Sequence, residues 1–298
     1  MRVLIRAFNR LIVGGLAVWL TAGRWTIQAQ APTATNAAET LDAAMTQASS
    51  QHKPLMVLVA ESGRSRADDT ALHLIESSKT GQSPRGLASC VLDLGLSRNR
   101  AIAARFHPVQ TPLLVCLSSR GVIISRDTKP LSKRLILEWA DEAVQKGPEL
   151  DAQLLALQQE LQTSSNSVAA LFALSDFLLA RGNALEAIPP LAMLAHRETV
   201  DDGRRVQAWV ALARAHLWIG EPEKARAEAT SLIATLGPRL AEARAGGKLI
   251  LGIHDANLNR PAQARREFEE AIAQAPDTAY AKEAAKMIED LRKGWTAK

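Results

Sequence analysis

Residues 53–66 read KPLMVLVAESGRSR, and this stretch decides the fold of the first half of the chain. Its apolar run, Leu55 to Ala60, has no polar residue, which is typical of a strand buried on both faces of a sheet. The polar segment Glu61 to Arg66 follows at once and predicts a short loop. Apolar side chains at helical spacing then predict a helix over Ala67 to Glu76. A strand, a loop and a helix in this order predict the beginning of an α/β fold.

Further strands and helices surround this unit. Residues 90–94 read CVLDL, and residues 99–126 read NRAIAARFHPVQTPLLVCLSSRGVIISR. The second stretch contains a Thr-Pro step and a Gly turn between two apolar runs, which indicates a hairpin. The flanking elements that we expect are helices over 39–49, 99–106 and 131–145 and strands over 90–94, 113–117 and 122–125. Together they predict a sheet packed between helices.

This order of elements resembles the thioredoxin-like family. In that family the loop after the first of these strands carries a Cys-x-x-Cys pair that performs thiol–disulfide exchange. Here that loop runs through Ser62 and Ser65 and contains no sulfur. The resemblance also implies that the Thr111–Pro112 bond is cis, beside a backbone edge that can pair with an extended peptide. It therefore implies a domain of α/β thioredoxin-like sandwich type with an inactive redox centre and a groove formed by Ser62, Ser65, Thr111 and Pro112.

The serines of this loop have two interpretations. As a nucleophile, Ser62 or Ser65 would need an oriented base, and the nearest candidate is His107, in the segment that the family places beside the loop. As a structural residue, either serine caps the helix that begins near Ala67. Because one histidine offers neither an oxyanion hole nor a group that orients it, we expect the cap.

The chain has two cysteines, Cys90 and Cys116. In an exported protein two cysteines suggest a disulfide. The thioredoxin-like resemblance implies instead that their strands flank the Leu55–Val59 strand on opposite sides. Two strand spacings place the Cα atoms about 10 Å apart, which exceeds the limit of about 7 Å for a disulfide. We therefore expect two buried free thiols.

Strand patterns end near Glu149, and helical patterns continue to the C-terminus. Residues 149–162 predict a connecting helix, and three later segments then align with one another. They read LFALSDFLLARGNALEAIPPLAML, WVALARAHLWIGEPEKARAEATSL and KLILGIHDANLNRPAQARREFEEA. Each has a turn residue that tolerates left-handed backbone (Gly182, Gly220, Asn259) and an alanine five residues later (Ala187, Ala225, Ala264).

The aligned alanines recur 38 and 39 residues apart. The repeats resemble the tetratricopeptide family, whose period is normally 34 residues. The resemblance covers residues 168–292 and implies an all-α, TPR-like helical solenoid with longer units than usual. Pro189 and Pro190 fall in the second helix of the first unit and are expected to bend it. Residues 279–291 predict the polar capping helix that such arrays need.

The first helix of each unit carries the stripe that we expect to bind a partner. In the second unit this stripe has spacings of 3, 4 and 4 residues. Across the three units the predicted partner-binding residues are Phe172, Asp176, Gln207, Val210, Arg214, Trp218, Ile253 and Asn257. Trp218 and Arg214 form a plausible hot-spot pair for a peptide or a helix. The alternative is that Trp218 belongs to the core and Arg214 is merely solvated.

The first 31 residues have the pattern of an export signal. They contain four arginines and no acidic residue, and Leu11 to Ala22 form an apolar stretch shorter than the roughly 20 residues of a membrane span. We expect cleavage after Ala29, with an uncleaved anchor that reaches Ile27 as the alternative. Removing this segment lowers the net charge from +5 to +1, which argues against nucleic-acid binding. The sequence therefore predicts a periplasmic or cell-envelope protein of bacterial type.

The predicted organisation follows from these patterns. It is a signal peptide over 1–29, a linker over 30–38, a thioredoxin-like domain over 39–147, a connecting helix over 148–164 and TPR-like repeats with a capping helix over 165–298. The six histidines are scattered and no glycine-rich phosphate loop occurs, so we expect no metal and no cofactor.

We interpret the chain as a non-catalytic protein-interaction module that binds another protein or a peptide. It is expected to bind no nucleic acid and to have no membrane span once the signal is removed, and the sequence leaves its oligomeric state open. The alternatives are a weak thiol–disulfide oxidoreductase acting through Cys90 or Cys116, an envelope enzyme of chaperone type, and a structural spacer.

Overall fold

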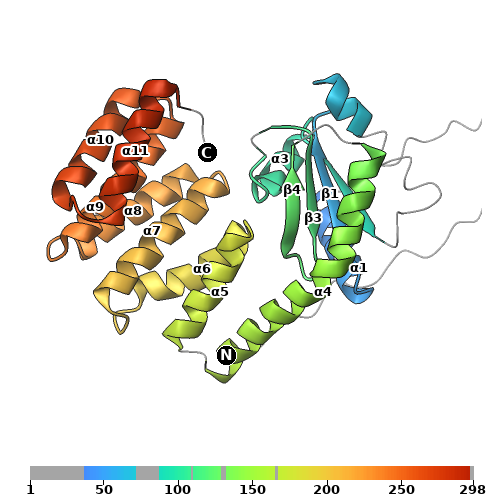
Figure 1. Cartoon of the computed structure of the whole chain (residues 1–298), viewed down its shortest axis with the longest axis horizontal. Helices are drawn as coiled ribbons and strands as arrows, with labels where there is room; N and C mark the ends of the chain where they lie inside the picture. The colour runs from blue at the N-terminus through green and yellow to red at the C-terminus, as the bar shows by residue number, and fades with distance from the viewer. Residues whose placement is uncertain (1–36, 72–86, 109, 129–131, 165–166, 296–298) are drawn as a thin grey trace, which may run out of the picture. The chain divides into compact units, whose positions relative to one another are not determined.

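The computed structural model of this chain describes residues 37–71, 87–108, 110–128, 132–164 and 167–295. The N-terminal part, residues 37–71, 87–108 and 110–128, holds a four-stranded mixed sheet and is here called the sheet region. The rest of the described chain is all-helical, with eight helices, α4 to α11, and is called the helical region (Figure 1). The expected signal peptide lies outside the described residues, as do residues 72–76 of the predicted second helix. Residues 67–71 of that helix are helical, as predicted, and the helix begins one residue earlier, at residue 66.

The sheet has the strand order β2-β1-β3-β4. The strands are β1 (Leu55–Ala60), β2 (Ala88–Asp93), β3 (Leu113–Leu117) and β4 (Ile123–Asp127). Strand β1 pairs in parallel with β2 and antiparallel with β3, and β3 forms a hairpin with β4. Cys90 lies opposite Val57 on one side of β1, and Cys116 lies opposite Met56 on the other. Both thiols are free and buried, which confirms the sequence prediction.

Both faces of the sheet are buried, which explains the unbroken apolar run of β1. One set of alternate β1 residues, with Val57 and Val59, packs with helices α1 (Ala37–Ser50) and α3 (Ser97–Ala104). The other set, with Met56 and Leu58, packs against the first turns of α4. All six residues of β1 are buried because successive side chains of a strand point to opposite faces.

Helix α4 (Lys133–Thr163) joins two segments that the sequence analysis predicted as separate helices. The boundary drawn between residues 147 and 148 therefore falls inside a continuous helix, with Pro148 in its interior. Proline removes one backbone hydrogen bond, but both halves of the helix are anchored. Ile136 and Ala140 pack on the sheet, and Leu150 and Leu154 pack in the core of the helical region. This packing holds the helix together through the proline.

Seven further helices follow one another in the helical region (Figure 1). They are α5 (Val168–Ala180), α6 (Ala184–His196), α7 (Asp202–Trp218), α8 (Pro222–Thr235), α9 (Ala241–Asn257), α10 (Pro261–Gln274) and α11 (Ala279–Lys293). The turn residues Gly182, Gly220 and Asn259 have positive φ, as predicted. Ala187, Ala225 and Ala264 are fully buried where paired helices approach. Helix α6 is not interrupted at Pro189 or Pro190. Within the described residues, no helix is both long and apolar enough to span a membrane.

Candidate functional site

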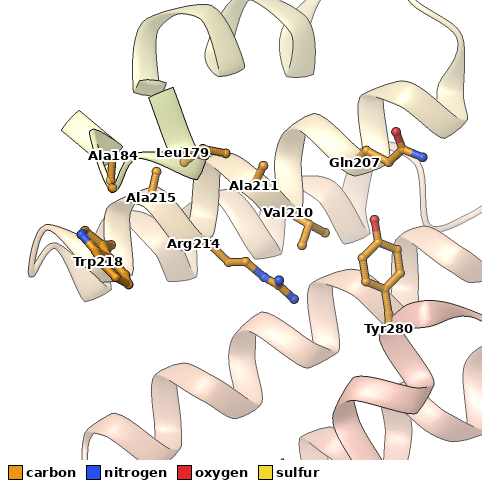
Figure 2. Close-up of a pocket in the computed structure, with 10 residues that line it drawn as sticks. Leu179, Ala184, Gln207, Val210, Ala211, Arg214, Ala215, Trp218 and Tyr280 are labelled. Atoms are coloured by element: carbon orange, nitrogen blue, oxygen red, sulfur yellow. The ribbon is translucent and has the colours of Figure 1, made fainter. Parts of the chain in front are cut away.

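Helix α7 forms one wall of a cavity of about 400 Å³, here called the inner hollow. Figure 2 shows its lining side chains, with Val210 and Arg214 projecting from α7 on the side of Tyr280. The lining residues are Leu179, Gly182, Ala184, Gln207, Val210, Ala211, Arg214, Ala215, Trp218 and Tyr280. The wall is mostly apolar, and burial raises the pKa of Tyr280 to about 12, with a further contribution from Glu242. The tyrosine therefore stays neutral and can donate a hydrogen bond.

A second cavity of about 230 Å³, the distal hollow, continues from the same helix toward α9 and α11. Its lining residues are Arg214, Leu217, Trp218, Ile253, Asn257, Glu283, Met287 and Trp295. Arg214 and Trp218 line both hollows. Trp295 donates a hydrogen bond from Nε1 to Asn257 Oδ1 at 3.1 Å, so the end of the described chain forms part of this wall.

Six of the eight predicted partner-binding residues line these hollows: Gln207, Val210, Arg214, Trp218, Ile253 and Asn257. Phe172 and Asp176 do not. Phe172 packs against the helical core, and Asp176 is exposed to solvent. On α5 only the last turn reaches the inner hollow, through Leu179. The sequence shows which residues share a helix face, but it does not show which turn of that face meets the cavity.

Arg214 is an ion-paired residue in the wall. Its guanidinium donates to Glu283 on α11, and its Nε is buried with no hydrogen-bond partner among the described residues. The arginine therefore bridges α7 and α11 at the junction of the hollows, while its side chain is 41% exposed. Glu283 offsets much of its charge, so Arg214 is not available as a free cation for an anionic ligand.

Trp218 is partly buried and contacts both the helical region and the sheet region. Its ring stacks on His107, with ring centroids 4.6 Å apart and an angle of 20° between the planes. Arg126 lies over the same tryptophan, 4.9 Å from the ring centroid. One tryptophan therefore contacts the sheet region and also forms the wall of both hollows.

His107 forms a hydrogen bond with Trp218 in addition to the ring stack. Its Nδ1 lies 2.7 Å from the carbonyl oxygen of Trp218, and because a carbonyl only accepts, Nδ1 carries the proton and donates. Its Nε2 is buried and has no hydrogen-bond partner in the part of the chain that the structure describes. The pKa of His107 is lowered by burial and by the nearby charge of Arg126, which together outweigh the bond to Trp218.

Asn183, a residue that the sequence analysis did not single out, completes the contact between the two regions. It is 4% exposed, and its Oδ1 accepts from the Ile123 N–H at 2.9 Å while its Nδ2 donates to the Gly121 carbonyl at 2.9 Å. The amide thus forms the two hydrogen bonds that a neighbouring strand would form with the end of the hairpin. In the sequence, an asparagine just before a predicted helix indicates only a helix cap. In the structure the Asn183 side chain does not cap α6.

The loop serines are hydrogen-bonded to carboxylates. Ser62 donates from Oγ to Asp93 at 2.7 Å, and Ser65 donates to Asp68 at 2.5 Å while accepting from the Asp68 N–H at 3.1 Å. Burial raises the pKa of Asp93, but hydrogen bonds from Ser62 and Gly95 outweigh it and leave the pKa below its usual value. The cap interpretation is confirmed for Ser65, and neither hydroxyl bonds to a histidine within the described residues.

The remaining predicted features of the sheet region concern a proline and a thiol. The Thr111–Pro112 bond is cis, as expected. Burial, with a contribution from Glu142, raises the pKa of Cys116 to about 12. A thiol with this pKa has almost no thiolate at neutral pH and is a poor nucleophile. No group of histidine, cysteine, aspartate or glutamate within the described ranges could hold a metal ion.

Comparison with known proteins adds no assignment to this geometry. No model of a protein family matches the chain, and no curated protein matches its sequence significantly.

Proposed function

We propose that this chain is an exported, non-catalytic protein-interaction module that binds a segment of a partner polypeptide in the hollows beside α7. The observation that carries this proposal is the pair of mostly apolar hollows that meet at Arg214 and Trp218. Apolar cavities with a few polar groups are typical binding sites. The proposed partner is a protein or a peptide of the periplasm or cell envelope.

The fold assignment that accompanies this function is also a proposal. A sheet of order β2-β1-β3-β4 with helices on both faces and a cis proline before β3 is consistent with a thioredoxin-like domain. Repeated helical hairpins with buried alanines at their close approaches are consistent with a TPR-like array. The loop from Glu61 to Arg66 has no cysteine, and Cys116 is buried with a raised pKa. These features favour a binding role over thiol–disulfide exchange.

A structural spacer is the second candidate, favoured by the contacts between the sheet and the helices. The paired hydrogen bonds of Asn183 and the ion pair between Arg105 and Glu186 show that the sheet region braces the helical region. A spacer needs these contacts between the two regions, but it does not need open hollows. The experiment below separates the two candidates by filling a hollow while leaving the brace intact.

The test is crosslinking of the full chain in the native envelope, followed by recovery of the chain and identification of its partners. The variant is Ala211→Trp, because Ala211 lines the inner hollow and a tryptophan there would fill it. The matched control is Ala273→Trp, at an exposed position on α10 that does not line either hollow. We expect Ala211→Trp to lower recovery of a specific partner about tenfold or more and the control to leave it unchanged. Equal recovery with both variants would favour the spacer.

A further inference from the structure

A third cavity, of about 490 Å³, lies at the end of the sheet where β1 begins and β3 ends. Three segments form it: the turn between α1 and β1, the turn between β3 and β4, and the middle of α4. Its lining residues are His52, Lys53, Pro54, Ser119, Arg120, Val144, Gly147, Pro148 and Asp151. We call it the turn pocket. It does not share a residue with the inner hollow or the distal hollow, and it lies at the sheet end opposite to Ser62 and Thr111.

The turn pocket has a positive balance of charge. Lys53 and Arg120 are both exposed, and neither forms an ion pair with another described residue. Many other cations in the described ranges are paired, as in Lys146 with Glu142 and Arg134 with Glu138. His52 adds a third basic group. Two cations that form no ion pair with a described residue favour an anionic ligand at this cavity, because arginine and lysine both bind carboxylate and phosphate groups.

The acidic residue in the pocket, Asp151, accepts two hydrogen bonds from the turn between β3 and β4. Asp151 accepts a hydrogen bond from the Ser119 hydroxyl at 2.6 Å and another from the Arg120 N–H at 3.3 Å. Its carboxylate therefore ties the β3–β4 turn to α4 and positions the arginine at the cavity. Asp151 bonds to the backbone of Arg120 and not to its guanidinium, which forms no ion pair with another described residue.

The other two basic residues, His52 and Lys53, are held on a turn by backbone hydrogen bonds. At the end of α1, the N–H of His52 donates to the Ser49 carbonyl at 3.2 Å, and the N–H of Lys53 donates to the Ala48 carbonyl at 2.9 Å. His52 adopts a left-handed backbone conformation with φ 53°, in the place where helices usually end on glycine. The turn thus presents two basic side chains next to each other at the mouth of the pocket.

One wall of the pocket is apolar. Val144 is 46% exposed and lines the cavity. Pro148 follows one turn later and also lines the cavity. These two side chains could cover an apolar group, while the cations on the facing turns hold a charged group.

We propose that the turn pocket binds a small organic anion, in which a carboxylate or a phosphate lies between Lys53 and Arg120 and a short apolar body lies against Val144. The cavity has the size of a typical small-molecule site. This proposal rests on the sheet region and α4 and does not depend on the partner-binding role of α7.

The test is isothermal titration calorimetry of the full chain at low ionic strength with three probes: phenyl phosphate, benzoate and inorganic phosphate. We expect saturable binding of phenyl phosphate or benzoate, with affinity about tenfold higher than that of inorganic phosphate, because only the aromatic probes contact Val144. Tighter binding of phenyl phosphate would identify phosphate as the preferred anion, and tighter binding of benzoate would identify carboxylate.

The variants are Lys53→Gln and Arg120→Gln, both at exposed positions. Each is expected to weaken binding of the aromatic probe about five- to tenfold. The matched control is Arg134→Gln, which removes the same charge from an exposed position on α4 outside the pocket. The proposal is overturned if neither aromatic probe saturates, if inorganic phosphate binds as tightly as they do, or if Arg134→Gln weakens binding as much as Arg120→Gln.

Discussion

The ring of His107 stacks on the ring of Trp218 at 4.6 Å, and its Nδ1 donates to the backbone carbonyl of the same tryptophan. The two residues are 111 positions apart in the chain, one just before the cis proline bond and the other at the end of α7. Since Trp218 also lines both hollows, the sheet region directly supports the proposed binding surface. The sheet region therefore positions this tryptophan through His107 and Arg126.

Replacing Trp218 with alanine should destabilise the chain. The substitution removes the stack with His107 and the contact with Arg126, and it enlarges the cavity beside α7. Because the side chain is only partly buried, we expect a loss of about 2–3 kcal/mol in the free energy of unfolding, less than the roughly 3–5 kcal/mol typical of buried aromatic residues. Urea denaturation measures this loss. Trp218→Phe keeps an aromatic face and should recover at least half of it; equal losses would show that stacking contributes nothing.

The stability of the junction should depend on pH through His107. Because the pKa of His107 is lower in the folded chain than its ordinary value of 6.5, the unfolded chain binds a proton first as the pH falls below 6.5. Acidification therefore favours unfolding, by at most about 1.4 kcal/mol per pH unit, until the pH reaches the folded pKa. His107→Gln removes this dependence, so the difference in unfolding free energy between the wild type and this variant should shrink between pH 7 and pH 5. A constant difference would contradict the assigned role.

Asn183 should be essential for the docking of the hairpin on the helices. Asn183→Ala leaves the Ile123 N–H and the Gly121 carbonyl without partners in a buried place. We expect a loss of about 2–3 kcal/mol and faster hydrogen exchange at the Ile123 amide. Asn183→Asp keeps the acceptor but loses the donor, so it should also destabilise the chain.

A matched control for Asn183 is Asn257→Ala. This exposed asparagine accepts a single hydrogen bond, from Trp295, so its loss should cost less than about 1 kcal/mol. Similar losses for Asn183→Ala and Asn257→Ala would mean that the bonds to the hairpin contribute little.

Much of the local structure could be predicted because it depends on patterns within one segment. The apolar run of β1 shows burial on both faces, and the recurring turn residues and alanines show the helical hairpins. Helical periodicity alone determines which residues share a face, and the residues of the stripe predicted on α7 all line the inner hollow.

The errors arose where distant segments decide the outcome. Periodicity could not show that Trp218 stacks on a histidine of the sheet region, or that Arg214 pairs with Glu283. The unbroken course of α4 through Pro148 depends on packing at both ends of that helix. Asn183 had the pattern of a helix cap, but its partners lie about 60 residues earlier in the chain.

Gly252 should be required for the contact between α9 and α10. A Cβ at this position would lie 2.4 Å from the Phe268 ring, which is fully buried. Alanine has a higher helix propensity than glycine by about 1 kcal/mol, so a freely exposed site would gain stability. We expect Gly252→Ala instead to cost about 1–3 kcal/mol, because the aromatic ring has no space to move. The change in Tm on thermal unfolding shows whether the substitution stabilises or destabilises the chain. A raised Tm would contradict the close approach of the two helices.

The two cysteines should be unreactive toward disulfide reagents in the folded chain. Both are buried and free, and a pKa of about 12 leaves Cys116 with about one thiolate in ten thousand molecules at pH 8. We therefore expect an aromatic disulfide reagent to react with neither cysteine in the native protein and with both in denaturant. The wild type and the double variant Cys90→Ser, Cys116→Ser should reduce a disulfide reporter equally slowly. Activity that the wild type has and the double variant lacks would restore the oxidoreductase interpretation, because only a reachable thiolate can attack a disulfide.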